Sequence, residues 1–380
     1  MDTRTLVFAD IVDSTAHAER IGEERAAALW AEHDHQARRL LAEHGGREID
    51  RSDGFFLLFE RSAEALRFVT AYHRMLGALG IAARVGVHTG AVSLRANDPQ
   101  EVAHGAKPLE VDGLAKPLAA RIMALASGGR TLITGATAAK LEPNALDGRA
   151  LHRHGHYRFK GIAEPVEVAE VAASQAACAP PADVEKAYRV VRGDDGLWHP
   201  LRAVPHNLLP ERDVFVGREA ELRELADRLD AADTRLVTVL GPGGIGKTRL
   251  VHRYARAWLG EWPGGVAFCD LSEARSLDGI HYAVALALGV PLGKDDPALQ
   301  LGHAIAGRGR CLVILDNFEQ VQVYAEATVG RWLDRAPEAR FVVTSRERLQ
   351  LPGEQSVALE PLDPDGDAMQ LFEARARAQR

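Results

Sequence analysis

Hydrophobic and polar residues alternate with two different periods along residues 5 to about 170. Apolar side chains recur at helical spacing over residues 24–41, whereas short apolar runs such as 6–11 are typical of strands. This alternation predicts an α/β domain over residues 1–172. Its expected elements are strand 6–11, helix 20–44, hairpin 47–59, helix 62–78, strand 82–88, loop 95–113, helix 117–126, strand 131–134 and a closing strand pair near 156 and 166.

The pattern fails between Ala172 and Arg212, and a second block follows it. Prolines accumulate in this stretch, and because proline lacks a backbone N–H we expect a connector over residues 173–212. From residue 213 onward strands again alternate with helices, which predicts a domain over residues 213–380 with a mainly parallel sheet covered on both faces. The expected elements are helix 218–231, strand 235–240, helix 247–259, strand 266–270, helices 278–288 and 297–306, strand 311–315, helix 325–335 and strand 340–344. The chain stops inside an apparent helix over 368–380, so we expect further protein to follow.

Composition narrows the class of protein. A chain of 380 residues is too long for one ordinary core, and 46% hydrophobic with 26% charged residues is typical of a globular protein. The net charge of -7 argues against a general nucleic-acid binder, because affinity for the phosphate backbone comes from clustered Lys and Arg. The three cysteines share no close spacing, which predicts reduced packing residues. No signal peptide and no apolar run of membrane-spanning length is present, so we expect a cytoplasmic protein without a membrane partner.

A phosphate-binding loop is predicted in the second block by the run Gly241-Pro242-Gly243-Gly244-Ile245-Gly246-Lys247-Thr248. The run has the P-loop spacing and lies between an expected strand and an expected helix. Its glycines let backbone N–H groups turn toward the phosphates of ATP or ADP, and the lysine adds a positive charge. Thr248 is the expected Mg²⁺ ligand.

Two later strands end in residues that fit this loop. An apolar strand ends in Asp316, the expected second Mg²⁺ ligand, and Glu319 is a candidate to orient an attacking water, with a plain surface charge as the alternative. The next strand ends in Arg346, which is placed to contact a γ-phosphate.

These motifs, together with Phe215-Val216-Gly217-Arg218-Glu219, resemble the NB-ARC-like ATPases of the STAND class in order and spacing over residues 210–380. The resemblance implies that Val216, Gly217 and Arg218 lie against the adenine. It also implies that the domain acts as a nucleotide-dependent switch more than as a fast hydrolase.

The first block has a pair of aspartates in strand-like apolar runs. Asp10 ends the run 6–11, and Asp53 precedes the run 55–59. A carboxylate at the end of a buried strand is costly unless a cation or hydrogen bonds compensate it, so the pair predicts a divalent-metal site.

The segments around both aspartates resemble the metal-binding segments of class III nucleotide cyclases, and residues 84–90, 119–121 and 157–165 extend the match over residues 5–170. The resemblance implies a ferredoxin-like cyclase domain that works as a head-to-tail dimer, so we expect a homodimer or a higher oligomer. Asp10, the carbonyl of Ile11 and Asp53 would hold two Mg²⁺ or Mn²⁺ ions, and Arg121 from the other subunit would stabilise the transferring phosphate. The substrate would be a nucleoside triphosphate, with ATP expected and GTP as the alternative.

Two positions depart from this family. Pro117 stands where the family has its transition-state asparagine, and proline supplies neither an amide side chain nor a backbone N–H. Ile49 and Asp50 stand where the family's base-reading lysine is expected, and Glu110 or Asp112 would be its partner.

Three functions follow from these observations. The first is a cyclase that forms a 3′,5′-cyclic nucleotide and pyrophosphate under the control of a STAND-type ATPase domain. The second is a weakly active or inactive cyclase-like domain that dimerises or senses nucleotide. The third is a transcription regulator, although residues 1–380 contain no pattern typical of a helix-turn-helix.

Overall fold

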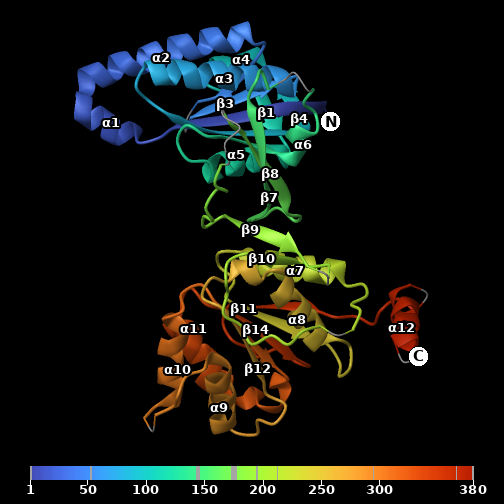
Figure 1. The fold of residues 1–380 in the computed structure, drawn as a ribbon. Coiled ribbons are helices and arrows are strands. Elements are labelled where there is room, and N and C mark those ends of the chain that lie inside the picture. The colour runs from blue at the N-terminus through green and yellow to red at the C-terminus, as the bar shows by residue number, and fades with distance from the viewer. Residues whose placement is uncertain are drawn as a thin grey trace. The chain divides into compact units, whose positions relative to one another are not determined.

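The computed structural model forms two compact units, Met1–Val191 and Arg192–Arg380 (Figure 1). None of the helices it describes is both long enough and apolar enough to cross a membrane. The described residues are 2–51, 54–142, 146–172, 178–193, 196–211, 213–293, 295–364 and 366–378.

A mixed β-sheet forms the centre of the first unit. Its strands follow the order β9-β7-β8-β6-β4-β1-β3-β2, and β5 pairs with β4. The pair β4 and β6 is parallel, whereas β1 runs antiparallel to both of its neighbours, β3 and β4. The strands are β1 Asp2–Ile11, β2 Arg47–Asp50, β3 Phe55–Phe59, β4 Ala83–Ala96, β5 Leu109–Asp112, β6 Thr131–Thr134, β7 Ala150–Phe159, β8 Val166–Ala172 and β9 Ala187–Arg192.

Helices cover both faces of this sheet. Because side chains alternate along a strand, Val7 and Ala9 pack on one face with Tyr72 of α3, whereas Leu6 packs on the other face with Ala119 of α5. The helices are α1 Ser14–Ile21, α2 Glu23–Glu43, α3 Ser62–Ala78, α4 Pro99–Ala103, α5 Ala115–Leu125 and α6 Gly135–Ala138.

Helix α5 lies very close to the sheet at Gly86. A Cβ atom on Gly86 would stand 2.2 Å from the backbone N of Met123 and 2.8 Å from the carbonyl O of Ala119. The missing side chain therefore allows α5 to rest directly on β4.

The first unit differs from the expected elements in several places; for example, β4 continues to Ala96 and α6 was not expected. The helix expected over 20–44 is broken at Gly22, whose φ of 87° ends α1 and begins α2. The expected loop 95–113 contains α4 and β5, and Asp98 caps α4 by accepting a hydrogen bond from the N–H of Gln100. The expected connector contains β9, which pairs with β7.

The second unit contains a parallel sheet in the order β12-β13-β14-β11-β15. The expected mainly parallel sheet is therefore confirmed, and β15 is an addition that the pattern did not predict. The strands are β11 Leu236–Leu240, β12 Val266–Asp270, β13 Leu312–Asp316, β14 Arg340–Ser345 and β15 Glu354–Ala358, and a short strand β10, Trp198–Pro200, precedes them.

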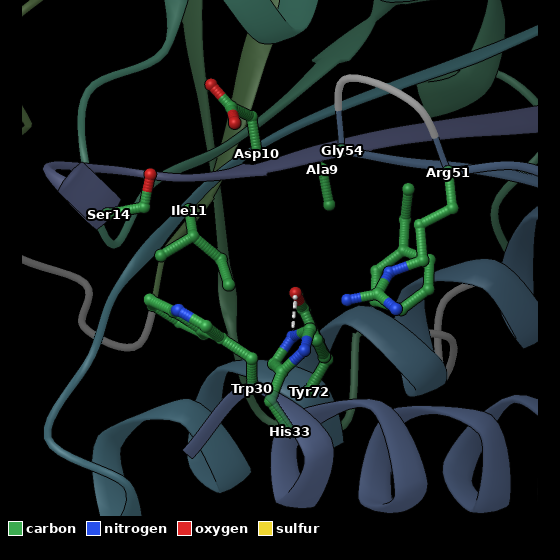
Figure 2. A pocket seen from close by; sticks show the side chains of 10 residues that line it. Ala9, Asp10, Ile11, Ser14, Trp30, His33, Arg51, Gly54 and Tyr72 are labelled. Carbon is green, nitrogen blue, oxygen red and sulfur yellow. Dashed lines mark hydrogen bonds between the residues drawn. The ribbon is translucent and has the colours of Figure 1, made fainter. Parts of the chain in front are cut away.

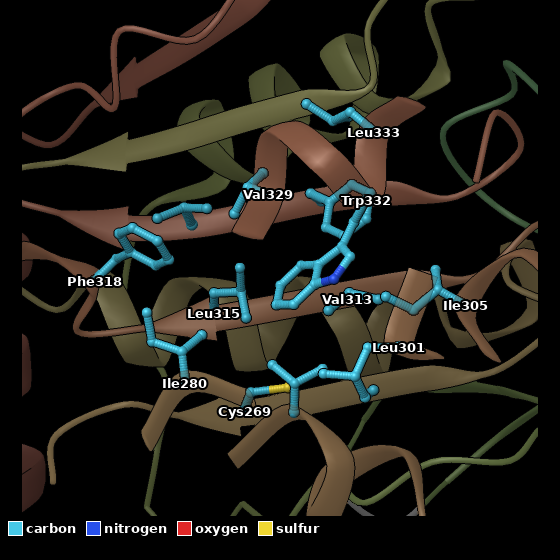
Figure 3. Close-up of a cluster of buried hydrophobic side chains, with 14 of the residues drawn as sticks. Cys269, Ile280, Leu301, Ile305, Val313, Leu315, Phe318, Val329, Trp332 and Leu333 are labelled. Atoms are coloured by element: carbon cyan, nitrogen blue, oxygen red, sulfur yellow. The ribbon is translucent and has the colours of Figure 1, made fainter. Parts of the chain in front are cut away.

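Both faces of this sheet are covered by helices. Trp332 is completely buried between the sheet and the helices of one face, where it contacts residues of α9 and α10 (Figure 3). Tyr254 of α8 lies in the core of the other face together with Leu225 of α7. The helices are α7 Glu219–Asp230, α8 Lys247–Ala257, α9 Leu277–Leu288, α10 Pro297–Ala306, α11 Arg331–Arg335 and α12 Asp367–Ala378.

Candidate functional site

The phosphate-binding loop of the second unit connects the end of β11 to the start of α8. Gly241, Gly244 and Gly246 have φ values of 156°, 77° and 102°, which residues with a side chain rarely adopt. Lys247 is only 7% exposed, and its Nζ donates to the carbonyl oxygens of Gly241 at 2.8 Å and Pro242 at 3.1 Å. The lysine thus holds its charge over the loop, where a phosphate would displace the two carbonyl contacts.

Asp316 and Thr248, the two expected Mg²⁺ ligands, lie in contact, at the end of β13 and the start of α8. The hydroxyl of Thr248 donates to both carboxylate oxygens of Asp316 at 3.0 Å, and the hydroxyl of Thr344 donates to one of them at 2.5 Å. Burial raises the pKa of Asp316 from its ordinary value, although hydrogen bonds from Thr344 and Thr248 act in the opposite direction. A buried carboxylate and a hydroxyl are suitable ligands for Mg²⁺, which would also offset the cost of burying the charge.

Thr344 is a site residue that the sequence analysis missed. It lies on β14, which separates β11 from β13 in the sheet, and its oxygen also accepts the backbone N–H of Asn317 at 2.9 Å. Its position at a strand end beside Arg346 was the available signal, but the strand order was needed to place it next to Asp316.

Arg346 and Glu319 form an ion pair near the loop. The Nε of Arg346 lies 3.3 Å from Oε1 of Glu319, and the arginine side chain is 64% exposed. One Nη atom of Arg346 would be 3.3 Å from a Cβ on Gly243. The arginine expected to contact a γ-phosphate is therefore beside the P-loop, together with the acid proposed to orient water.

The segment expected to contact adenine is tied to the same helix as the P-loop. Arg249 of α8 donates to the carbonyl oxygens of Asp213 and Val214, which precede Val216 by three and two residues. Ile245, the remaining member of the run, packs against the core on the α7 and α8 face.

Arg218 is the last residue of this segment, and its side chain fixes the segment to two other parts of the unit. Its φ is 70°, and its guanidinium donates to the carbonyl oxygen of Glu360 at 2.7 Å and to the carboxylate of Glu221 at 2.5 Å. The segment is thus held between α7, α8 and the chain that follows β15.

In the first unit, Asp10 lies opposite Arg84 in the pairing of β1 with β4. The Nε and Nη2 atoms of Arg84 donate to one carboxylate oxygen of Asp10 at 3.0 and 2.6 Å, and both side chains are about one third exposed. Arg84 is the second residue that the sequence analysis missed, because only the strand register brings it to Asp10.

The other expected metal ligand, Asp53, lies outside the described residues. Gly54, the next residue, has a φ of 110°, and a Cβ there would stand 2.4 Å from the carbonyl oxygen of Ala9. The start of β3 therefore rests against the end of β1, and Ile11 is the last residue of that strand. Figure 2 shows the Asp10 carboxylate pointing away from the side on which Ile11 and Trp30 lie.

Arg121 and Pro117 are four residues apart on α5 and so share one face of the helix. The helix begins at Ala115, which places Pro117 in the first turn, where a missing N–H costs little. The Arg121 guanidinium lies against Gly161 in the turn between β7 and β8, because a Cβ there would be 3.4 Å from both Nη atoms.

This turn and Asp10 lie at opposite edges of the sheet, in the sense that they lie at opposite ends of its strands. Asp10 pairs with Arg84 at the start of β4, β6 runs parallel to β4, and β8 runs antiparallel to β6. The start of β8, and with it the turn after β7, is therefore at the far edge. Within a single copy of the first unit, Arg121 is therefore directed away from Asp10.

A lysine is found next to the position where the resemblance expects one. The Nζ of Lys107 donates to Oδ2 of Asp50 at 2.5 Å. Glu110 lies nearby on β5, where its carboxylate accepts a hydrogen bond from Asn97, which in turn donates to the carbonyl oxygen of Lys107. A lysine and an acid thus meet here, although the lysine comes from a different segment.

Comparison with known proteins gives separate results for the two units. The profile of the AAA ATPase domain family matches residues 214–359. An uncharacterised protein of Mycobacterium tuberculosis is 32% identical over 178 residues, which are 47% of this chain and 45% of that protein. The regulatory protein AfsR of Streptomyces griseus is 28% identical over 253 residues, which are 61% of this chain and 25% of that protein. The chain thus spans less than half the length of each of these relatives.

Among solved structures, adenylate cyclases from Trypanosoma brucei are similar to this chain, with a TM-score of 0.41 and 20% identity over 48% of this chain and 93% of that chain. The adenylyl cyclase CyaB from P. aeruginosa has a TM-score of 0.40 and 17% identity over 46% of this chain and 95% of that chain. In the second unit, the family match covers the P-loop, Asp316 and Arg346, so this unit contains an AAA-type ATPase domain.

Proposed function

We propose that the first unit is a nucleotide cyclase that converts ATP, with GTP as the alternative, to a 3′,5′-cyclic nucleotide and pyrophosphate, and that ATP binding in the second unit regulates it. The observation that carries this proposal is the Asp10 carboxylate at the end of β1, which accepts two hydrogen bonds from Arg84 and lies where Gly54 rests against the β1 backbone. A strand-end carboxylate beside a partly exposed arginine is suited to metal–triphosphate binding.

The ion pair of Asp10 and Arg84 supports an exchange of partners. Both side chains are partly exposed, so their mutual attraction is weak, on the order of 1 kcal/mol or less. A divalent cation would compete for Asp10, and the released guanidinium would then bind the triphosphate that arrives with the cation. Two ions held by Asp10, the Ile11 carbonyl and Asp53 would activate the ribose 3′-hydroxyl and neutralise the leaving pyrophosphate.

The position of Arg121 favours a site shared by two copies of the chain. Its guanidinium is directed to the edge of the sheet opposite Asp10, so a second copy would have to supply the arginine. A head-to-tail homodimer has two such sites, each made from Asp10 of one copy and Arg121 of the other.

The second unit is proposed to hold ATP or ADP with Mg²⁺ and to act as a STAND-type switch. Lys247, Thr248 and Asp316 are placed to hold the phosphates and the ion. A γ-phosphate would compete with Glu319 for Arg346, so ATP and ADP would leave this ion pair in different states.

A second candidate function is nucleotide sensing without turnover. Pro117 is exposed in the first turn of α5, where its structural role is complete without catalysis, and it occupies the helix face of Arg121. Under this alternative the first unit binds a nucleoside triphosphate, dimerises and forms no product.

The test is product analysis with ATP and GTP separately, in Mn²⁺ and Mg²⁺, over a range of protein concentrations. We expect cyclic nucleotide from the native chain, a loss of about 100-fold or more in Asp10→Asn, and a gain of about 10-fold or more in Pro117→Asn. Asp2→Asn, at the exposed opposite end of β1, is the matched control and should leave the rate unchanged. Absence of product from every variant, with nucleotide still bound, would favour the sensing alternative.

A further inference from the structure

A pocket of about 230 Å³ lies on the face of β1 and β3 that packs against α2 and α3, opposite the face of the Asp10 carboxylate. Figure 2 shows Trp30, His33 and Tyr72 together on the helix side, below Ile11 and Ala9. The pocket therefore adjoins the proposed metal site: the Asp10 carboxylate points to the other face of the strand, whereas Ile11, whose carbonyl is a proposed metal ligand, lines the pocket.

The floor of the pocket is polar but uncharged. The Nε2 of His33 lies 2.9 Å from the hydroxyl oxygen of Tyr72, its Nδ1 lies 2.9 Å from Asp34, and both rings are at most 2% exposed. Burial, helped by the positive charge of Arg51, lowers the pKa of His33 to about 4. Because a carboxylate only accepts, the neutral ring donates from Nδ1 to Asp34 and accepts the Tyr72 hydroxyl at Nε2.

The walls are aromatic and aliphatic. Trp30, Phe55 and Ile11 line the pocket, and the ring of Phe55 also packs against the ring of His33, with 5.5 Å between their centres. Such walls favour a flat apolar body.

The positively charged side chain of Arg51 lines the pocket. The guanidinium of Arg51 lies 5.2 Å from the centre of the Phe55 ring and contacts Asp34 through one terminal nitrogen. A guanidinium has five N–H donors in a planar fork, so the contact with Asp34 through one nitrogen leaves other donors able to bind a carboxylate. Among the described lining residues, Arg51 is the side chain that selects for negative charge, since the Asp10 carboxylate points away.

We propose that this pocket is a binding site for a single-ring aromatic carboxylate. The ring lies between Trp30, Phe55 and Ile11, and the carboxylate binds Arg51. The volume supports this size, because an apolar cavity of about 150 Å³ accepts benzene and the extra space accommodates one carboxylate. A nucleotide is too large for it.

The site does not rest on the proposed cyclase activity. Its ligand would contact Ile11 and Arg51, so it would be bound directly beneath the end of the strand that carries Asp10. Binding is measured without metal or nucleotide, so it can succeed or fail whatever the outcome of the product analysis.

The test is calorimetric titration of the full chain with benzoate and with benzamide, its neutral isostere. We expect saturable binding of benzoate and at least about 10-fold weaker binding of benzamide, because only benzoate forms the charge-assisted contact. Equal affinities, or no saturation by benzoate, would overturn the proposal, and this comparison needs no variant.

Variants locate the site. Arg51→Met should remove the preference for benzoate, whereas Arg47→Met, an exposed arginine of β2 outside the pocket, should keep it. If Arg51→Met fails to fold, Trp30 reports instead: benzoate should change tryptophan emission in the native chain and not in Trp30→Phe. A preference unchanged in folded Arg51→Met, or an emission change that persists in Trp30→Phe, would contradict the assignment.

Discussion

The two units differ in how they arrange the residues of their candidate nucleotide-binding sites. In the second unit every strand of the sheet runs in the same direction, so the carboxyl ends of β11, β13 and β14 lie at the same side. Thr248, which follows β11, and Thr344, at the end of β14, therefore both contact Asp316, at the end of β13. In the first unit neighbouring strands mostly run in opposite directions, and Asp10 and the contact of Arg121 lie at different edges. A parallel sheet can complete a site by itself, whereas in this mixed sheet the proposed site would need a second copy to complete it.

The largest expected effect is a loss of stability that is confined to the first unit and is caused by a single backbone clash. In Gly86→Ala the new methyl group would collide with the backbone of Met123 in α5, so we expect the first unit to lose roughly 3 kcal/mol or more of unfolding free energy. Hydrogen exchange with peptide resolution should show unprotected amides in the first unit and native protection in the second.

Gly77→Ala is the control for this change. Gly77 lies in α3, and a methyl group at this position would have no neighbouring atom within 4 Å, so alanine should be neutral or slightly stabilising. Equal loss of protection in both units after Gly86→Ala would show that they do not fold independently and would weaken the comparison.

A smaller effect is expected from removing the charge in the P-loop. Lys247→Met leaves the loop glycines in place but removes the donor that would bind phosphate, so ATP affinity should fall about 10- to 100-fold. Titration with a fluorescent ATP analogue measures this, and Arg223→Met, on the exposed side of α7, is the matched control. Unchanged affinity in Lys247→Met would place the bound ATP in the first unit.

A further effect is expected in the acid sensitivity of the first unit, where each buried histidine contributes less than the Gly86→Ala clash. Burial lowers the pKa values of His33, His73 and His88 to about 4, while the unfolded chain titrates near 6.5. The unfolded state therefore binds more protons between these values, and stability is complete above pH 6.5 and is lost as the pH falls toward 4. At pH 5 each histidine should lower the free energy of unfolding by about 2 kcal/mol. Urea unfolding measures this, with hydrogen exchange in the first unit as the readout.

Replacing one histidine isolates its share of this effect. His88→Asn cannot be protonated in this range, so it should flatten the pH dependence by about one proton. A pH profile that matches the native chain would show that His88 binds its proton equally well in the folded and unfolded states.

Local signals were sufficient for much of the second unit. The P-loop glycines and the strand ending in Asp316 were placed correctly because each depends on a short stretch of sequence. In contrast, β15 lacked a recognisable apolar run, since its residues Glu354–Ala358 are largely polar and it pairs at the edge of the sheet.

The first unit was harder to predict where a single residue redirects the chain. Gly22 divides an apparently continuous helix, and Asp98 with Glu101 caps α4 inside an expected loop. Both signals are present in the sequence, but they compete with a longer helical or polar pattern that outweighs them.

The sequence by itself determined which chemistry each unit can offer: the P-loop with Asp316, and the carboxylate of Asp10 at the end of an apolar strand. These depend on residue type and local period. The tertiary structure alone decided which residues meet, including Arg84 with Asp10, Thr344 with Asp316 and Lys107 with Asp50. The physical reason is that strand order and register join segments far apart in the chain, and local patterning does not encode that pairing.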